Sequence, residues 1–130
     1  MNRKILITAS IFGALAVILG AFGAHGLKAH LTSQDLENWR TAVSYHFYHT
    51  LALLFLSLLS PKSRLTTLAF WAFSIGIILF SGSIYLLSTR AITGLNLPFL
   101  GPITPLGGLL FIVGWVCLLV TGLRTGDARV

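Results

Sequence analysis

The fold of this chain is decided by the stretch ILITASIFGALAVILGAFGA, residues Ile5–Ala24, which is 20 residues long and carries no charged side chain. About 20 consecutive apolar residues are enough to cross the hydrocarbon core of a bilayer as an α-helix. A helix satisfies its own backbone hydrogen bonds, whereas an open sheet would leave unpaired groups in lipid. The stretch therefore predicts a membrane-spanning helix.

Three further uncharged runs follow the first one. They are Thr41–Ser60 with 20 residues, Thr67–Thr89 with 23 and Leu106–Leu123 with 18. The only groups in the second run that titrate near neutral pH are His46 and His49. Each run is long enough to cross a bilayer, the last one if it stands nearly upright. We predict an all-α integral membrane bundle of four transmembrane helices, built as a single membrane domain over residues 1–130.

The composition of the whole chain supports a membrane protein. Of its 130 residues, 55% are hydrophobic and 9% charged, and the mean hydropathy is +0.88. Soluble domains have about one quarter charged residues, so an ordinary soluble fold is excluded. The net charge of +6 is dispersed and forms no nucleic-acid-binding signature. Cys117 is the only cysteine, which excludes an intramolecular disulfide.

Glycine and proline mark the expected helix ends. Gly26 follows the first span and Pro61 the second, while Pro98, Pro102 and Pro105 precede the fourth, so no helix interior contains a proline. Residues 95–105 are expected to form a Pro-Gly loop.

The polar segment TSQDLENWR, residues Thr32–Arg40, predicts a short interfacial helix between the first two spans. Thr32 or Ser33 is the expected N-cap, and acidic residues in the first turns suit the helix dipole. Trp39 is expected at headgroup level.

The distribution of lysine and arginine predicts the orientation. One side carries six basic residues and the other three, and the more basic side is expected to be cytoplasmic. Both termini are then cytoplasmic. The six are Arg3, Lys4, Lys62, Arg64, Arg124 and Arg129, and the three are Lys28, Arg40 and Arg90.

The first run also imitates a secretory signal peptide, with Arg3 and Lys4 before it and small residues near Gly23. We expect it to be retained as a span, because retention keeps an even number of helices and a coherent charge bias. Cleavage near Gly23 would leave three spans.

Histidine, tyrosine and serine gather toward the predicted outer side. The spacing i, i+3 places His46 and His49 on one helical face, with Tyr45 beside them. The third run has the opposite direction and brings serines and a tyrosine to similar depth. The candidate ligand-binding residues are His25, Tyr45, His46, His49, Ser81, Ser83 and Tyr85.

Three interpretations of this cluster stay open. Its side chains can fix helix register through hydrogen bonds, can bind a quinone, lipid headgroup, haem or metal, or can move protons or solutes. The cofactor is therefore unknown, and the histidine spacing alone assigns no metal. The sequence does not decide whether the chain is an enzyme, but it favours a protein without catalytic activity. The motifs HExxH, CxxCH and GxSxG are absent, and no span holds an acidic residue that could orient a histidine. No catalytic residue is assigned.

Small residues predict where helices approach each other. Ala16, Gly20 and Ala24 recur every four residues in the first span, and Ala72 and Gly76 do so in the third. Gly82 would also permit a close approach. The tryptophans, including Trp71 and Trp115, are expected to be interface anchors or packing residues.

Four motifs resemble one family. GAFGAHGLK (Gly20 to Lys28), W-x-x-A-V-x-Y-H-x-x-H (Trp39 to His49), FSGSIY (Phe80 to Tyr85) and TPLGG-x-x-F-x-x-GW (Thr104 to Trp115) are similar to the domain-of-unknown-function 423 (DUF423) membrane family. That family includes bacterial inner-membrane proteins and relatives of eukaryotic transmembrane protein 256. The resemblance implies a small multi-pass membrane protein with a retained first helix, and it transfers no activity. The family often has glutamine where this chain has His46, whereas His25 and His49 match its pattern.

The sequence thus predicts an uncharacterised multi-pass protein of a bacterial cytoplasmic membrane, acting as a structural, accessory or interaction component. The expected partners are the lipid bilayer and either further copies of the chain or a membrane complex, with no nucleic acid. The alternative is a binder of a small lipophilic ligand, such as a quinone, lipid or haem, at the outer His/Ser/Tyr cluster.

Overall fold

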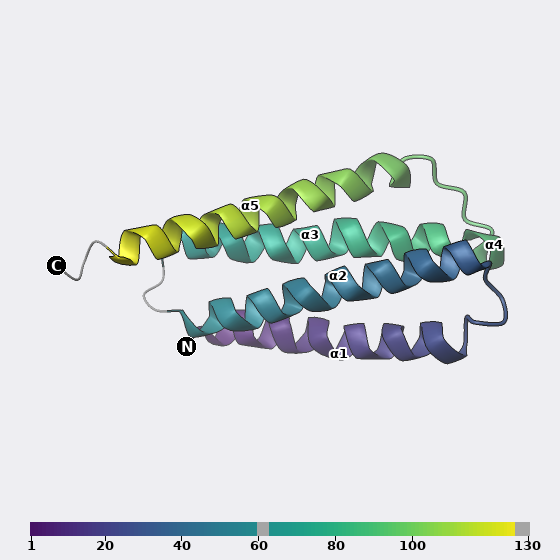
Figure 1. The fold of residues 1–130 in the computed structure, drawn as a ribbon, viewed down its shortest axis with the longest axis horizontal. Coiled ribbons are helices and arrows are strands. Elements are labelled where there is room, and N and C mark those ends of the chain that lie inside the picture. Colours follow the sequence, from purple (N-terminus) through teal and green to yellow (C-terminus); the bar gives the residue numbers. More distant parts are fainter. Residues whose placement is uncertain (60–62, 127–130) are drawn as a thin grey trace.

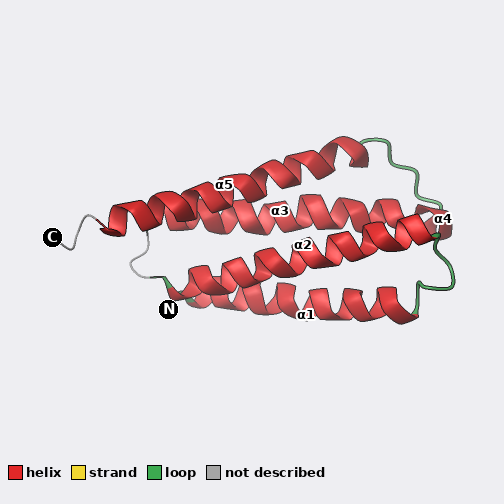
Figure 2. Ribbon diagram, viewed as in Figure 1, coloured by secondary structure: helices red, strands yellow, loops and turns green. Residues whose placement is uncertain are grey.

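All regular structure in the described part of the chain is helical, which confirms the all-α prediction. A computed structural model describes residues 1–59 and 63–126. Figure 2 shows helices and loops only. The helices are α1 (Arg3–His25), α2 (Ser33–Leu58), α3 (Arg64–Ser88), the single turn α4 (Arg90–Thr93) and α5 (Leu100–Gly126).

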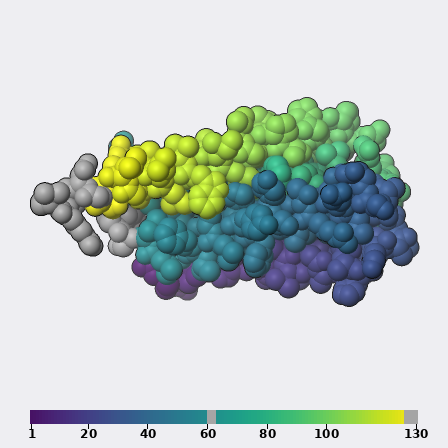
Figure 3. Space-filling view, in the orientation of Figure 1, coloured from purple at the N-terminus to yellow at the C-terminus, as the bar shows by residue number. Residues whose placement is uncertain are grey.

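The four long helices run side by side in alternating directions (Figure 1). In this bundle α2 packs against α1 and α3, and α3 packs against α5. The starts of α1 and α3 lie at one end together with the ends of α2 and α5, while α4 and the loop after α1 lie at the other. In the space-filling view, α2 and α5 lie next to each other on the face toward the viewer (Figure 3).

Within the described residues, three helices are long and apolar enough to cross a membrane. They are α1, α3 and residues Leu100–Thr125 of α5. Helix α2 has sufficient length at 26 residues, but its polar first turns, histidines and tyrosines lower its hydropathy. The described part of the chain is therefore all-helical and contains apolar helices long enough to span a membrane.

The predicted interfacial helix is not a separate element. Residues 33–40 are the first turns of α2, which continues without interruption to Leu58. No glycine or proline lies between Thr32 and Leu58, so nothing breaks the hydrogen-bond ladder between the polar and apolar parts. The N-cap prediction at Thr32 is confirmed, because its side chain accepts a hydrogen bond from the Asp35 backbone N–H at 3.1 Å.

The proline prediction for the fourth span is wrong, because α5 begins at Leu100 and includes Pro102 and Pro105. Pro102 lies in the first turn, where backbone N–H groups have no intrahelical partner and proline removes nothing. Pro105 lies deeper and removes one bond, the bond to the Gly101 carbonyl. The described loop is accordingly shorter than predicted and lies between Gly94 and Phe99. Gly94 has φ +69°, the only left-handed residue in the described chain, and it ends α4.

The core draws on all four long helices. Its centre is Phe73, Leu53 and Leu56, each at most 1% exposed. Ala9 and Ala16 of α1 are also buried, but Ala24 is exposed and does not extend the small-residue face. The core residues are Ile5, Ala9, Ala52, Leu53, Leu56, Ala69, Phe73, Ile77, Phe111 and Cys117.

Helices α3 and α5 approach closely through reciprocal glycine contacts. Phe111 of α5 lies over Gly76, and Phe73 of α3 lies over Gly114. Gly107 meets the backbone of Phe80 directly, with no room for a Cβ. Gly76 is therefore a contact residue as predicted, whereas a Cβ on Gly82 would have open space around it, so Gly82 is not a contact point.

Candidate functional site

His49 lies between α2 and α5 with both ring nitrogens hydrogen-bonded. Its Nδ1 lies 2.7 Å from the Tyr45 carbonyl oxygen, and its Nε2 accepts from the Trp115 indole N–H at 3.1 Å. A nitrogen that accepts an N–H must be unprotonated, so this geometry holds a neutral imidazole with the proton on Nδ1. The ring also stacks on Phe111, with centroids 3.5 Å apart and planes 5° apart.

His46 contacts α1 and α3, and its partners differ from those of His49. Its Nδ1 lies 2.9 Å from the Tyr85 hydroxyl, and its ring meets Phe12 edge-on. Nε2 is buried and has no hydrogen-bond partner among the described residues. Ser81 is nearby and donates to the Ala42 carbonyl of α2 at 2.7 Å. These contacts tie α2 to α3 through buried polar side chains.

The geometry of α2 directs the two histidines to partners on different helices. A step of three residues turns the side-chain direction by about 300°, which leaves them about 60° apart. An offset of this size is consistent with the sequence prediction that both side chains share one helical face. In the bundle, however, it is large enough for His46 to bond Tyr85 of α3 and for His49 to bond Trp115 of α5.

The other predicted residues have separate surroundings. Ser83 faces α5, where its hydroxyl lies 2.6 Å from that of Thr104. Tyr45 is 41% exposed and lies against Phe80, with ring centroids 4.8 Å apart. His25 ends α1, is exposed and joins none of these contacts. The structure therefore joins His46 to Tyr85 and His49 to Tyr45, whereas Ser81 and Ser83 bond residues outside the predicted set, so the predicted residues do not surround one centre.

Sequence reasoning missed three partners. Trp115, Phe111 and Thr104 all belong to α5 and complete the contacts of His49 and Ser83. The motif TPLGG-x-x-F-x-x-GW contains all three, at spacings of seven and four residues that keep them near one face of a helix. This spacing in the sequence could have indicated that the three side chains face the same neighbouring helices.

Of the two roles predicted for the tryptophans, interface anchor or packing residue, Trp39 has the packing role. It is 4% exposed, donates its indole N–H to the Leu19 carbonyl at 2.9 Å, and occupies the space beside Gly23 where a side chain would stand. Its ring also lies against Tyr85, with centroids 4.6 Å apart. Trp39 therefore fixes α2 against α1 from within the bundle.

A groove of about 920 Å³ opens between α2 and α5, and Phe80 of α3 also lines it. Its walls are aromatic and apolar, and the only imidazole among them is that of His49, whose nitrogens are already bonded. Besides His49 and Trp115, which bond each other, the polar side chains in the lining are those of Tyr45 and Tyr48. The lining residues are Tyr45, Tyr48, His49, Phe80, Pro105, Gly108, Leu109, Phe111, Ile112 and Trp115.

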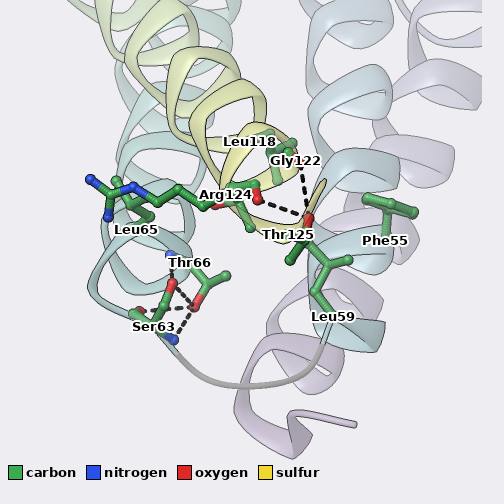
Figure 4. A pocket seen from close by; sticks show the side chains of 10 residues that line it. Phe55, Leu59, Ser63, Leu65, Thr66, Leu118, Gly122, Arg124 and Thr125 are labelled. Atoms are coloured by element: carbon green, nitrogen blue, oxygen red, sulfur yellow. Dashed lines mark hydrogen bonds between the residues drawn. The ribbon is translucent and has the colours of Figure 1, made fainter. Parts of the chain in front are cut away.

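A smaller hollow of about 410 Å³ lies at the opposite end, between the end of α2, the start of α3 and the end of α5 (Figure 4). The Ser63 and Thr66 side chains bond each other and the adjacent backbone, and the Thr125 hydroxyl donates to carbonyls of α5. Arg124 extends from α5 toward Leu65. The hydroxyls are thus occupied within the helix ends, which favours a structural role for them.

The described residues contain no group of three or more His, Cys, Asp or Glu side chains that could hold a metal ion. His46 and His49 diverge, and His25 lies apart at the end of α1. These three histidines therefore do not come together as the ligands of one metal ion.

The apolar helices and the buried polar pairs between them define a small all-α integral membrane protein. The chain belongs to the family described as "Protein of unknown function (DUF423)", which matches residues 19–108. This confirms the resemblance noted in the sequence. The family description names no activity.

Curated relatives cover almost the whole chain. It is 43% identical to the UPF0382 membrane protein YwdK of Bacillus subtilis (strain 168), over 94% of this chain and 98% of that protein. It is 40% identical to the UPF0382 membrane protein SH2409 of Staphylococcus haemolyticus (strain JCSC1435), over 85% and 91%. A UPF0382 membrane protein of Haemophilus influenzae (strain ATCC 51907 / DSM 11121 / KW20 / Rd) is 37% identical over 91% and 92%. No solved structure matches the chain.

Proposed function

We propose that this protein is a structural or accessory component of a bacterial cytoplasmic membrane, and that its conspicuous polar residues serve helix register. One observation carries the proposal: both nitrogens of His49 are used inside the bundle, one by its own helix and one by Trp115. A side chain with no free donor or acceptor is poorly suited to bind metal or haem. Interhelical hydrogen bonds of this kind contribute about 0.6 kcal/mol each in membrane proteins.

The proposal includes four transmembrane helices in a single domain. Its support is the antiparallel match of α2 with α1. The Asn2 backbone N–H donates to the Ser57 carbonyl at one end, and Trp39 bonds Leu19 near the other. A helix of 26 residues is about 39 Å long, more than the roughly 30 Å hydrocarbon core. If α1 crosses the bilayer, α2 crosses beside it.

Both termini are proposed to be cytoplasmic, with the first helix retained. The support is the excess of lysine and arginine in the sequence segments assigned to the side of the termini, of which Lys62 and Arg129 lie outside the described residues. The bacterial relatives are named membrane proteins, which supports a location in a membrane.

The partners proposed are lipid and a second membrane-embedded chain, either another copy or a subunit of a complex. The outward faces of α1 and α5 support this, because large apolar side chains on both are more than half exposed. Among them are Val17, Ile18, Leu109, Leu119 and Leu123. Such faces suit either lipid or another helix.

A second candidate is the binding of a small lipophilic ligand, a quinone or a lipid, in the groove between α2 and α5. The observation that favours it is the aromatic wall formed by Tyr45, Phe111 and Trp115, with the side chain of Tyr48 also in the lining. Planar rings stack well on such walls. Haem is less well suited, because His49 would have to release Trp115 first.

One experiment separates the two candidates. The protein is purified gently and analysed by absorption spectroscopy, metal analysis and lipid mass spectrometry, with His49→Ala beside the wild type. Under the structural proposal the wild type carries no stoichiometric ligand and His49→Ala is destabilised. A stoichiometric ligand that is lost in a stably folded His49→Ala protein would overturn it in favour of the groove. His25→Ala is the matched control, because His25 is exposed and joins none of these contacts.

A further inference from the structure

Three cations and one exposed tryptophan line two adjoining hollows where α1 and α3 begin. A hollow of about 370 Å³ lies between the first turn of α1 and α3, with Arg3 and Lys4 on one wall and Trp71 on the other. A second hollow of about 480 Å³ adjoins it on α3 and carries Arg64. Both hollows share Thr67 and Trp71. We call this continuous surface the Trp71 site.

The polar and apolar parts of the Trp71 site are arranged by depth. Arg3 and Lys4 are the first two residues of α1, and Arg64 is the first residue of α3, so all three cations lie at the bundle end. Trp71 follows Arg64 by seven residues, which places it about 10 Å farther along the helix axis. Phe70 and Ile5 line the same hollow. A ligand here meets positive charge at one end and an aromatic and aliphatic wall below it.

The local charge favours an anion. Arg3, Lys4 and Arg64 are all exposed, so their charged groups can reach a ligand without loss of a buried contact. The two acidic residues that the structure describes, Asp35 and Glu37, lie in the first turns of α2, at the other end of the bundle. The third, Asp127, lies outside the described residues.

We propose that the Trp71 site binds an anionic phospholipid, with the phosphodiester held by Arg3, Lys4 and Arg64 and the upper acyl chain lying on Trp71. Basic hollows between transmembrane helices at the membrane surface suit such headgroups, and tryptophan prefers the boundary between headgroups and chains. Free phosphate shares the charge but would leave the apolar wall unused, so the site fits a lipid better than a soluble anion.

The test uses the fluorescence of Trp71 in the full-length protein. The protein is reconstituted into phosphatidylcholine vesicles that contain a minor fraction of brominated phosphatidylglycerol or, in parallel, the same fraction of brominated phosphatidylcholine. Bromine quenches a tryptophan only at close range. The contribution of Trp71 is the difference between the wild type and Trp71→Phe. We expect the anionic lipid to be preferred at Trp71 by about tenfold, and each of Lys4→Gln and Arg64→Gln to lower the preference by a factor of about two to five.

Two controls keep this proposal falsifiable. Arg64→Lys keeps the charge and should retain most of the preference, while Arg124→Gln removes a cation from the same end but outside the Trp71 site. Circular dichroism checks that each variant keeps its helices. Equal quenching by the two lipids in the wild type would overturn the proposal. So would an equal loss in Arg124→Gln and Arg64→Gln, since it would show only a general surface potential.

The source of the phosphate is tested in the same vesicles. Inorganic phosphate, added at constant ionic strength, should leave the lipid preference unchanged. If it abolishes the preference, the site takes a soluble anion and the assignment to a phospholipid is wrong.

Discussion

The indole N–H of Trp115 donates to Nε2 of His49 at 3.1 Å and joins α5 to α2. Because α5 packs chiefly on α3, this contact connects the last helix to the middle of the bundle. It also keeps the His49 imidazole stacked on Phe111, with its other nitrogen at the Tyr45 carbonyl. A half-exposed tryptophan in the centre of α5 is thus explained by a polar partner on another helix.

The energy of this pair can be measured by a double-mutant cycle. We expect Trp115→Phe and His49→Ala each to destabilise the protein, and the double variant to lose less than the sum, with a coupling energy of about 0.6 kcal/mol and at most about 1.7 kcal/mol. The measurement is unfolding of the purified protein in mixed micelles titrated with sodium dodecyl sulfate, followed by circular dichroism. Strict additivity would show that the hydrogen bond contributes nothing.

Trp39 and Trp71 should respond differently to the same substitution. Trp39→Phe removes the donor to the Leu19 carbonyl and part of a buried ring, so we expect a loss of about 1–2 kcal/mol. Trp71 is 55% exposed, and Trp71→Phe should change stability by no more than about 0.5 kcal/mol. The same unfolding assay compares them. Equal losses would contradict the burial of Trp39 seen between α1 and α2.

These contacts show which parts of the molecule the sequence could predict. The apolar runs and the breaker Gly26 located the long helices, because helix length in a bilayer depends on local composition. The partners of His46 and His49 depend on which helices pack against α2, and a local sequence pattern does not specify the packing order of the helices. The depth of Trp39 could not be predicted for the same reason: its amphipathic ring suits an interface, but it packs closely at Gly23 and donates its indole N–H to the Leu19 carbonyl of α1.

The backbones of α3 and α5 approach each other closely at Gly107 and Phe80. Gly107→Ala would place a Cβ 2.8 Å from the Phe80 Cα, against backbone that cannot move aside alone. We expect a loss of about 1–3 kcal/mol from overpacking. Gly82→Ala is the matched control, because nothing lies within 4 Å of a Cβ there. Thermal unfolding in detergent measures both. A tolerated Gly107→Ala would mean that the two helices are farther apart than the structure places them.

The number of spans can be decided by thiol labelling in intact cells, and this is the sharpest test of the proposed topology. In a Cys117→Ser background, single cysteines are introduced by Lys28→Cys, Leu95→Cys and Arg124→Cys, all at exposed positions. A membrane-impermeant maleimide labels only thiols outside the cytoplasmic membrane, and lysis before labelling serves as the control for reactivity.

With four spans and cytoplasmic termini, the thiols at positions 28 and 95 are labelled in intact cells and the thiol at 124 only after lysis. If α2 lay on the membrane surface instead, α3 would cross in the opposite direction, so position 95 would be protected and position 124 labelled. Labelling of 124 alone would mean that four spans are correct but inverted. We expect the first pattern, because the hydrogen bonds Asn2–Ser57 and Trp39–Leu19 hold α2 beside α1 near both of its ends.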